Sequence, residues 1–352
     1  MKKALLSVFI FLFTISFYIS YSQNKIITDQ SDQVSKLFKS QKVLPLKISY
    51  SNRYIKEKTN DSTYLKVNLS YQNDSGTWKT IDIKLRKRGN FRLENCHYSP
   101  IKIKIKKSNS KGTLFEGNKK LKLVLPCFTN KSKNDYILKE YIAYKLYEEI
   151  SNYHFKTRIT TISYTEIAGN KTKSHFLKGI VVEDDKVVAK RSGGEIIKRT
   201  IHPLNHDPIT SVQNAFFQFM IGCTDFSTAF QHNEKLLFAN NRIIPIPYDF
   251  DMSGFVNPNY AIVSDEMNEL GVTSVRDRLY RGFKRKKAIL QQVRQEFLDN
   301  KTKLIAIVDS YESNFEDPKQ FLEARDYILD FFEILENDAQ FQKQILNKLR
   351  TE

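Results

Sequence analysis

Residues 101–106 read IKIKIK, a strict alternation of isoleucine and lysine. A period of two residues is typical of a β-strand that turns one face to the core and the other to solvent. Three flanking runs alternate in a similar way, at residues 64–69, 80–85 and 121–125. Turn-forming residues separate the runs, with Asn-Asp-Ser-Gly at 73–76 and Gly-Asn at 89–90. We therefore predict an antiparallel sheet within residues 46–130.

The hydrophobic period lengthens after this sheet. A helix is expected to begin at Asn134 or Asp135, either of which can cap it, and to end near Ile150. Two more strands are expected near residues 158–166 and 176–183. Helices are then expected at residues 209–222, after Val275, and over much of 285–350. This order predicts an α+β chain, with a ligand-binding cleft at a crossover near residues 183–190.

The predicted organisation divides the chain into five segments. They are a signal peptide (1–22), a polar lead-in (23–45), a β-rich half (46–186), the core of a helical half (187–284) and C-terminal helices (285–352).

The first segment has the three parts of a secretory signal. Lys2 and Lys3 precede an apolar run at residues 4–18, and the small residues Ser20 and Ser22 stand where a signal peptidase reads. We predict cleavage after Ser22 and export to the periplasm, the cell surface or the medium. The alternative is an uncleaved anchor, because the apolar run approaches the length of a membrane span. No later segment is apolar for long enough, so the mature chain is predicted to lack a span.

The formal net charge of +17 restricts the partners of the protein. A basic field favours polyanions such as nucleotide phosphates, acidic envelope glycans, anionic lipids or nucleic acid. A lysine-rich solvated surface would give the same charge. Nucleic acid is the least favoured of these ligands, because the sequence has no recognisable nucleic-acid-binding motif.

The chain has three cysteines, Cys96, Cys127 and Cys223, and none of them forms a C-x-x-C pair. This spacing argues against a zinc site. In an oxidising compartment Cys96 and Cys127 could pair, because both lie in the strand-rich half. Cys223 follows an apolar run and is predicted to be a buried free thiol.

A group of polar residues in the second half has the composition of a phosphoryl-transfer site. Asp225 ends an apolar helix, Asn233 follows eight residues later, and an apolar segment then leads to Asp249 and Asp251. Phosphoryl transfer uses one carboxylate to orient or deprotonate the acceptor hydroxyl, and an Asn and a further carboxylate to hold magnesium. Asp251 is either a second ligand or a cap for the following turn. The alternative is that all four residues are loop caps and turn formers.

These residues carry a resemblance to a known family. The segments RGNF (88–91), Asp225 to His232-Asn233, and PIPYDFD (245–251) resemble the CotH kinase family, the spore-coat-protein-H-like relatives of protein kinases. The similarity covers roughly residues 80–285. It implies a divergent protein-kinase-like bilobal fold, with an antiparallel β-rich N-lobe containing one helix and a mainly helical C-lobe. It also implies binding of ATP with Mg²⁺ or Mn²⁺, and phosphate transfer to a protein or glycan hydroxyl.

The resemblance assigns roles to particular residues. Asp225 matches the catalytic-loop acid, Asn233 a metal-side residue and Asp249 the metal-binding acid. Lys122 and Glu140 are best placed for the expected pair of a phosphate-contacting lysine and a helix glutamate, with Lys102 and Lys104 as alternative lysines. The alternative for this pair is an ordinary exposed lysine and a solvent-side acid.

Two features depart from the family pattern. The interval from Asp225 to Asn233 is long, so His232 or Gln231 could take the metal-side role. A G-x-G-x-x-G loop is absent, and the turn that follows Arg88 is a possible substitute, with basic residues facing phosphate. The alternative for this turn is a hairpin with charged flanks.

Two expectations remain open from the sequence. Residues 276–281 are expected to start a helix that either braces the Asp225 loop through salt bridges or is simply a charged face. The alternative to an enzyme is a catalytically inactive, kinase-like envelope binding or scaffold protein that holds acidic ligands.

Overall fold

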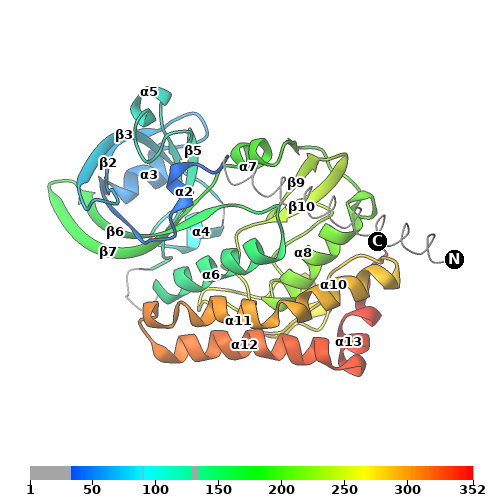
Figure 1. Ribbon diagram of the computed structural model, residues 1–352. Coiled ribbons are helices and arrows are strands. Elements are labelled where there is room, and N and C mark those ends of the chain that lie inside the picture. Colours follow the sequence, from blue (N-terminus) through cyan, green and yellow to red (C-terminus); the bar gives the residue numbers. More distant parts are fainter. Residues whose placement is uncertain (1–32, 90, 129–133, 352) are drawn as a thin grey trace, which may run out of the picture.

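A computed structural model of the chain describes residues 33–89, 91–128 and 134–351 (Figure 1). The predicted signal peptide and residues 23–32 of the predicted lead-in lie outside the described residues, as does Asn90.

Seven strands close into a barrel, the rounded body at the upper left of Figure 1. Their order around the barrel is β1-β2-β3-β4-β5-β7-β6. The strands are β1 (Leu44–Tyr50), β2 (Leu65–Gln72), β3 (Trp78–Lys87), β4 (Ile101–Lys104), β5 (Lys120–Val124), β6 (Thr157–Ala168) and β7 (Lys171–Val182). Neighbouring strands pair in antiparallel fashion except β1 and β6, which are parallel.

The alternation seen in the sequence decides which side chains fill the barrel. Ile101 and Ile103 of β4 are buried in the barrel core, and Lys102 and Lys104, which alternate with them, point outward. The strands predicted from period-two runs are therefore confirmed. The lysines of β4 therefore lie on the outer face of the barrel, where other parts of the chain or a ligand can contact them.

The predicted divergent protein-kinase-like bilobal fold, with an antiparallel β-rich N-lobe, is wrong. The sheet is closed and mixed because β1 pairs on both sides. Leu46 is opposite Tyr71 of antiparallel β2 and opposite Ile162 of parallel β6. The start of β1 was assigned to a polar lead-in. In that stretch Leu37 and Phe38, on the short helix α2 (Lys36–Lys39), are also buried in the barrel core.

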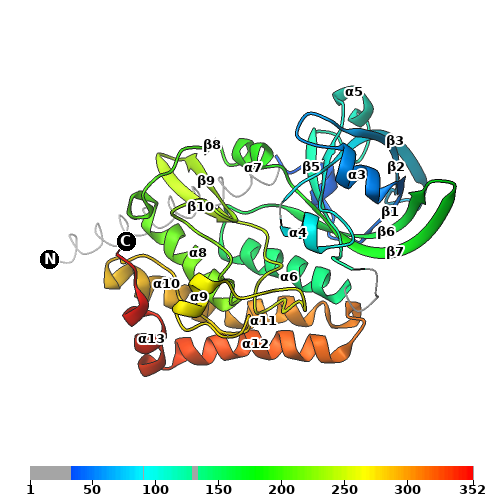
Figure 2. The ribbon, with the colours of Figure 1, turned by 180° about the vertical axis from the view of Figure 1, so that it is seen from behind.

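The second part of the molecule packs helices around a small sheet (Figures 1 and 2). The longer helices are α6 (Asn134–Ile150), α8 (Pro208–Met220), α10 (Lys287–Asp299), α11 (Lys301–Asp309), α12 (Pro318–Glu336) and α13 (Asp338–Gln344). The sheet has the order β10-β9-β8, from β8 (Glu195–Ile197), β9 (Glu234–Ala239) and β10 (Arg242–Pro247). None of the helices in the described part of the chain is long and apolar enough to cross a membrane.

Short helices complete the chain. They are α3 (Asn52–Lys58), α4 (Phe91–Asn95), α5 (Lys107–Ser110), α7 (Asp185–Arg191) and α9 (Asp265–Glu269), with 3₁₀ turns at Pro203–Asn205, Glu312–Asn314 and Leu346–Lys348. Helix α7 lies at the predicted crossover. The helix expected after Val275 is wrong, because residues 275–286 are irregular and α10 begins only at Lys287. The three-stranded sheet was not predicted.

The helical part has its own hydrophobic core, rich in aromatic rings. Phe217 of α8 packs against Tyr147 of α6, with ring centroids 4.7 Å apart, and Phe331 of α12 packs against Phe219 of α8. Asp135 joins α6 to the start of α12, because its carboxylate accepts hydrogen bonds from the backbone of Glu316 and Asp317 at 2.9 and 3.0 Å. Helix α6 thus lies between the barrel and the C-terminal helices.

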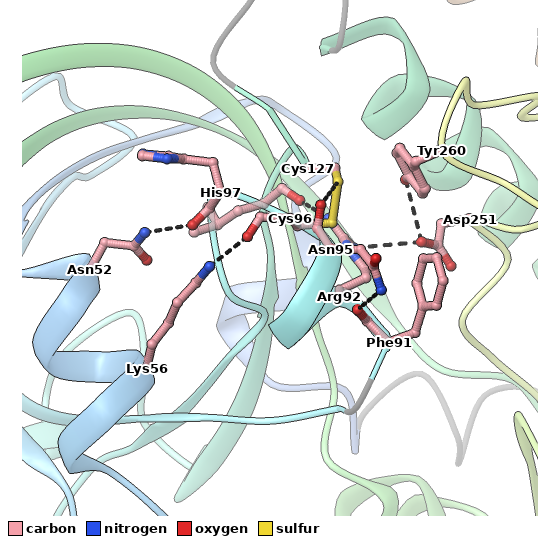
Figure 3. Close-up of a disulfide and its surroundings, with 11 residues drawn as sticks. Asn52, Lys56, Phe91, Arg92, Asn95, Cys96, His97, Cys127, Asp251 and Tyr260 are labelled. Atoms are coloured by element: carbon pink, nitrogen blue, oxygen red, sulfur yellow. Dashed lines mark hydrogen bonds and ion pairs between the residues drawn. A yellow bond between two sulfur atoms is a disulfide. The ribbon is translucent and has the colours of Figure 1, made fainter.

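The predicted disulfide is present. Cys96 and Cys127 are bonded, with Cα atoms 4.6 Å apart, and Cys223 is a buried free thiol. Figure 3 shows this bond beside α4, the helix that carries Arg92. The disulfide therefore ties the chain after α4 to the chain after β5.

A close backbone approach joins the end of α8 to the loop after β10. The backbone N–H groups of Gly254 and Phe255 donate to the carbonyls of Gly222 and Ile221 at 3.0 and 2.9 Å. Tyr327 of α12 packs against both glycines, where a Cβ atom would overlap its hydroxyl group. Gly222 also has a φ of +59°, which favours glycine.

We expect Gly222→Ala to be more destabilising than Gly112→Ala. Both glycines have positive φ, but nothing lies within 4 Å of a Cβ placed at Gly112. The backbone penalty alone is about 1–2 kcal/mol, and displacing Tyr327 adds roughly 1–3 kcal/mol by overpacking. Denaturant unfolding of the two variants checks this. Equal losses of unfolding free energy would show that the approach to Tyr327 is not tight.

Candidate functional site

A cavity of about 910 Å³ lies between the outer face of the barrel and the loops that follow α8 and β10. Helices α4 and α9 flank it, and Figure 2 shows both on one side of the molecule. Its basic lining residues are Arg88, Arg92, Lys102, Lys122, Lys235, Arg281 and Arg350. Its acidic lining residues are Asp184, Asp185, Asp225, Asp249, Asp251 and Glu266. The cavity therefore holds separated charges of both signs.

The loop from Asp225 to Asn233 folds back on itself. Ser227 and His232 exchange two backbone hydrogen bonds, at 3.1 and 3.0 Å. The Nδ2 atom of Asn233 donates to the carbonyl oxygen and to Oδ2 of Asp225, at 2.8 and 3.0 Å. The long interval between these two residues is thus closed by a hairpin, and Asn233 reaches Asp225 in spite of it.

Two other atoms of this hairpin bear on its chemistry. His232 Nε2 lies 3.0 Å from Asp225 Oδ1, and this hydrogen bond raises the pKa of His232. Within the described residues, no donor is hydrogen-bonded to Oδ1 of Asn233. The Asn233 amide oxygen is therefore available to a ligand, whereas His232 and Gln231, the alternatives considered above, bind Asp225 and the carbonyl of Arg199.

Arg281 holds the Asp225 loop from outside. Its Nη1 donates to the carbonyls of Thr224 and Phe226, both at 2.6 Å. These two residues flank Asp225, so the guanidinium group holds the backbone on either side of it. Residues 276–281 were expected to form a helix that either braces this loop through salt bridges or is a charged face. The segment is irregular, and Arg281 braces the loop through hydrogen bonds to backbone carbonyls instead.

Asp249 stands directly beside Asn233. The backbone N–H of Tyr248 donates to the carbonyl of Asn233 at 3.0 Å, and that of Asp249 donates to the Tyr144 hydroxyl of α6 at 2.9 Å. Asp249 has a φ of 66° and Asn233 a φ of 51°. Left-handed backbone is uncommon in residues other than glycine, and such strain often marks functional sites.

Asp251 is buried deeper, with 5% of its surface exposed. Its Oδ2 accepts a hydrogen bond from the Tyr260 hydroxyl at 3.3 Å and lies 3.8 Å from Arg92 Nη1 (Figure 3). Burial raises the pKa of Asp251 to about 6, although Arg92 opposes the shift. Arg92 also donates to the Leu125 carbonyl, so α4 and its disulfide position the guanidinium group.

Lys122 lies on the barrel wall of the cavity, but it does not pair with Glu140. Its Nζ is 3.9 Å from the centroid of the Tyr248 ring. Burial, together with the nearby Arg88, lowers the pKa of Lys122 to about 7. Lys102 also lines the cavity, and its Nζ lies 4.0 Å from Oδ2 of Asp184. Lys104 lies on the same outer face of β4 but does not line the cavity; its Nζ is 5.4 Å from the centroid of the Tyr64 ring.

Glu140 is completely buried and forms no ion pair with Lys122. Neither carboxylate oxygen has a hydrogen-bond partner among the described residues. Burial and the negative charges of Asp251 and Asp249 raise the pKa of Glu140 well above its ordinary value. The positive charges of Arg92 and Arg88 oppose this shift.

Arg88 belongs to the cavity wall, as predicted from its turn. Its Nη1 lies 3.9 Å from Asp249 Oδ2, and its Nε is buried without a hydrogen-bond partner in the described part of the chain. The φ of +72° at Gly89 lets the chain turn away immediately after Arg88. This Nε is shielded from the cavity, so an anion there would meet the outer guanidinium nitrogens, one of which lies near Asp249.

The sequence analysis missed Glu234, a buried residue that is hydrogen-bonded to the Asp225 hairpin. This residue begins β9 and is fully buried. Its Oε2 accepts hydrogen bonds from Asn214 of α8 at 2.6 Å and from Thr228 of the hairpin at 3.2 Å. Burial raises the pKa of Glu234 to about 7. An acid next to Asn233 at the start of an apolar strand was the available signal.

Comparison with known proteins identifies no family. No family model matches the sequence, and no curated protein matches it. The resemblance to the CotH kinase family therefore depends on the quoted motifs alone. In the described ranges, no group of three or more His, Cys, Asp or Glu side chains is arranged to hold a metal ion.

We expect Glu234 to make the protein less stable as the pH rises. A carboxyl group whose pKa is raised on folding stabilises the folded state fully at pH values below its unfolded-state pKa of about 4.5. This stabilisation is lost as the pH rises through the folded-state pKa of about 7. The loss is on the order of 3 kcal/mol for such a shift. Unfolding curves of wild type and Glu234→Gln between pH 4.5 and 8 should diverge by this amount. Glu333→Gln, which changes an exposed acid on α12, is the matched control. A parallel pH dependence of wild type and Glu234→Gln would refute the expectation.

Proposed function

We propose that the cavity binds a nucleoside triphosphate with Mg²⁺ or Mn²⁺ and transfers the terminal phosphate to a protein or glycan hydroxyl. One observation carries the proposal. Asn233 and Asp249, each in left-handed backbone, are joined through the Tyr248 N–H beside Asp225. They share a cavity with Arg88, Lys102 and Lys122. As part of this proposal, the site motifs are those of a diverged relative of the CotH kinase family.

The donor set suits a hard divalent cation. Asn233 Oδ1 and the Asp249 carboxylate are oxygen ligands, which Mg²⁺ prefers. Two protein ligands are enough for this ion when phosphate oxygens and water complete its shell. Asp251 is a second candidate ligand; its carboxylate accepts a hydrogen bond from Tyr260 and lies near Arg92. A cation held by Asn233 and Asp249 would neutralise negative charge on a bound phosphate chain.

The basic wall suits the phosphate chain. Arg88 lines the cavity, and Lys122 and Lys102 stand on the adjacent strands β5 and β4, directly opposite each other in register. A bound phosphate would favour the charged form of Lys122, whose pKa is lowered by burial in the free protein. Its ammonium group would then be paired with an anion instead of with Glu140.

Asp225 is the residue that would activate the acceptor. Its carboxylate is partly exposed to the cavity and is oriented by His232 and Asn233. In the proposed step, the acceptor hydroxyl oxygen forms a bond to the terminal phosphorus, and its proton passes to Asp225. The bond from that phosphorus to the bridging oxygen breaks, and the nucleoside diphosphate leaves with the electron pair.

A second candidate function has an observation of its own. The carboxylates of Asp249 and Asp251 each face a guanidinium group, at 3.9 and 3.8 Å, so the cavity is partly neutralised without a metal. An inactive binding or scaffold protein could use the remaining basic groups to hold an acidic glycan. In that case the carboxylates would be dispensable and the basic wall essential.

We expect Asp249→Ala to abolish magnesium-dependent nucleotide binding, because it removes the charged half of the cation site. Calorimetric titration with ATP in the presence of Mg²⁺ or Mn²⁺ measures this, and Asp82→Ala on the outer face of β3 is the control. Lack of nucleotide binding by the wild type with either metal would overturn the proposal. The scaffold function would instead be indicated if Asp249→Asn kept acidic-glycan binding and Lys122→Glu lost it.

We expect Asp225→Asn to separate binding from turnover. The amide keeps the size of the side chain but cannot take the proton of the acceptor, so phosphate transfer should fall by roughly 100-fold or more. Affinity for Mg²⁺-ATP should change little, since the proposed ligands Asn233 and Asp249 remain. Radiolabel transfer to a general protein acceptor such as casein, measured together with nucleotide affinity, tests this. If Asp225→Asn changes neither the transfer rate nor the affinity, the proposed role of Asp225 is wrong.

A further inference from the structure

Two of the most exposed large apolar side chains of the described chain lie at this one cavity. Phe230 is 84% exposed and Ile262 is 68% exposed, and both line it. Apolar groups of this size are normally covered, and exposed ones gathered at one place mark sites of interaction. The position of this pair beside the Asp225 hairpin is therefore informative.

Phe230 belongs to the hairpin that carries Asp225 and His232. Its backbone N–H donates to Ser227 Oγ at 3.3 Å, which holds the tip of the hairpin. Ile262 lies on the loop before α9, where Ser264 caps the helix by accepting from the Met267 N–H at 3.4 Å. Both side chains are thus presented by anchored backbone.

The two ends of the cavity differ in chemistry. The barrel end carries Arg88, Lys102 and Lys122, which suit phosphate. The end near α9 carries Ile262 and Val263 together with the polar residues Ser264 and Glu266, and the exposed Phe230 of the hairpin also lines the cavity. Glu266 and Ser264 could bind a hydroxyl group here, but the two large exposed side chains, Phe230 and Ile262, offer a surface that an apolar amino-acid side chain can cover.

One cation at the apolar end has no acidic partner. The Arg350 guanidinium group lies 4.8 Å from the centroid of the Phe283 ring, and no carboxylate of the described residues forms an ion pair with it. Arg281 beside it is committed to the hairpin carbonyls and lies 3.9 Å from Glu266. Among the described residues, Arg350 is therefore a cation without a carboxylate partner that a bound segment could pair with.

We propose that the acceptor is a polypeptide segment, held by a large apolar side chain against Phe230 and Ile262 and by an acidic residue against Arg350. This inference rests on the proposed phosphate transfer, because it assigns the acceptor to the end of the cavity beside Asp225. The hydroxyl residue that is modified lies within a few residues of the apolar anchor. Phe230 and Ile262 are specificity-determining residues and do not take part in the chemical step.

Synthetic peptides test the assignment. One serine peptide carries Leu and Glu near the serine, a second carries Gly in place of Leu, and a third carries Lys in place of Glu. With Mg²⁺-ATP and wild-type protein, we expect the first peptide to have a KM at least about 10-fold lower than the second, as burial of one large apolar side chain allows. The third peptide should also be poorer, and Arg350→Glu should reverse that preference.

Variants at the surface avoid the problem of misfolding. Phe230→Ala combined with Ile262→Ala should raise KM for the first peptide about 10-fold, with kcat and Mg²⁺-ATP affinity unchanged. Phe176→Ala is the matched control, because Phe176 is 81% exposed on β7 and does not line the cavity. Equal KM values for wild type and the double variant would overturn the proposal, as would preferred transfer to an oligosaccharide hydroxyl.

Binding without nucleotide separates this inference from the proposed function. Fluorescence anisotropy of the labelled first peptide measures docking in the absence of ATP and metal. If the wild type binds this peptide through Phe230 and Ile262 but binds no nucleotide, phosphate transfer fails and polypeptide docking stands. If the wild type binds Mg²⁺-ATP and the peptide affinity is the same in the double variant, the docking inference fails alone.

Discussion

The candidate site depends on backbone hydrogen bonds between two segments that are distant in the sequence. Ile221 and Gly222, at the end of α8, accept from Phe255 and Gly254, and Asn233 accepts from Tyr248. These bonds hold the Asp225 hairpin against the loop that carries Asp249 and Asp251. Main-chain pairing of this kind fixes side-chain positions more firmly than ion pairs between long side chains, because it costs no rotamer freedom. Tyr327 of α12 closes the back of the junction and leaves room only for glycine.

The barrel supplies the other wall because its strands alternate. Isoleucines of β4 and leucines of β5 point inward, so the lysines that alternate with them lie on the outer face. Lys102 and Lys122 are direct cross-strand neighbours there, which would be unfavourable for two isolated cations. The acidic residues across the cavity, Asp184 and Asp249 among them, compensate this repulsion. The arrangement leaves a basic surface facing acidic loops across a space that a phosphate ester and a cation could share.

Burial sets the charge balance beneath that space. Glu140 and Asp251 are both nearly inaccessible, and both have raised pKa values because water cannot stabilise their charged forms. Arg92 is the guanidinium group that offsets them both, and its position depends on α4 and the disulfide. Incompletely paired buried groups are costly in a stable fold, and in this protein they also occur away from the cavity, at Tyr147, Gln218 and Tyr280. What distinguishes the region of Glu140, Arg88 and Arg92 is the gathering of several buried charges of both signs.

Local pattern in the sequence was sufficient for the strands, for helices α6 and α8, for the buried state of Cys223 and for the candidate pair Cys96 and Cys127. Each of these depends on periodicity or composition within a few residues. The residues Arg88, Asp225, Asn233, Asp249 and Asp251 were also singled out, because carboxylates and amides after apolar segments are conspicuous. Closure of the barrel was not predictable in this way, since the pairing of β1 with β6 depends on the path of the whole chain. The charges around Glu140 were not predictable either, because they depend on how the whole chain packs and not on the spacing of Glu140 from Lys122.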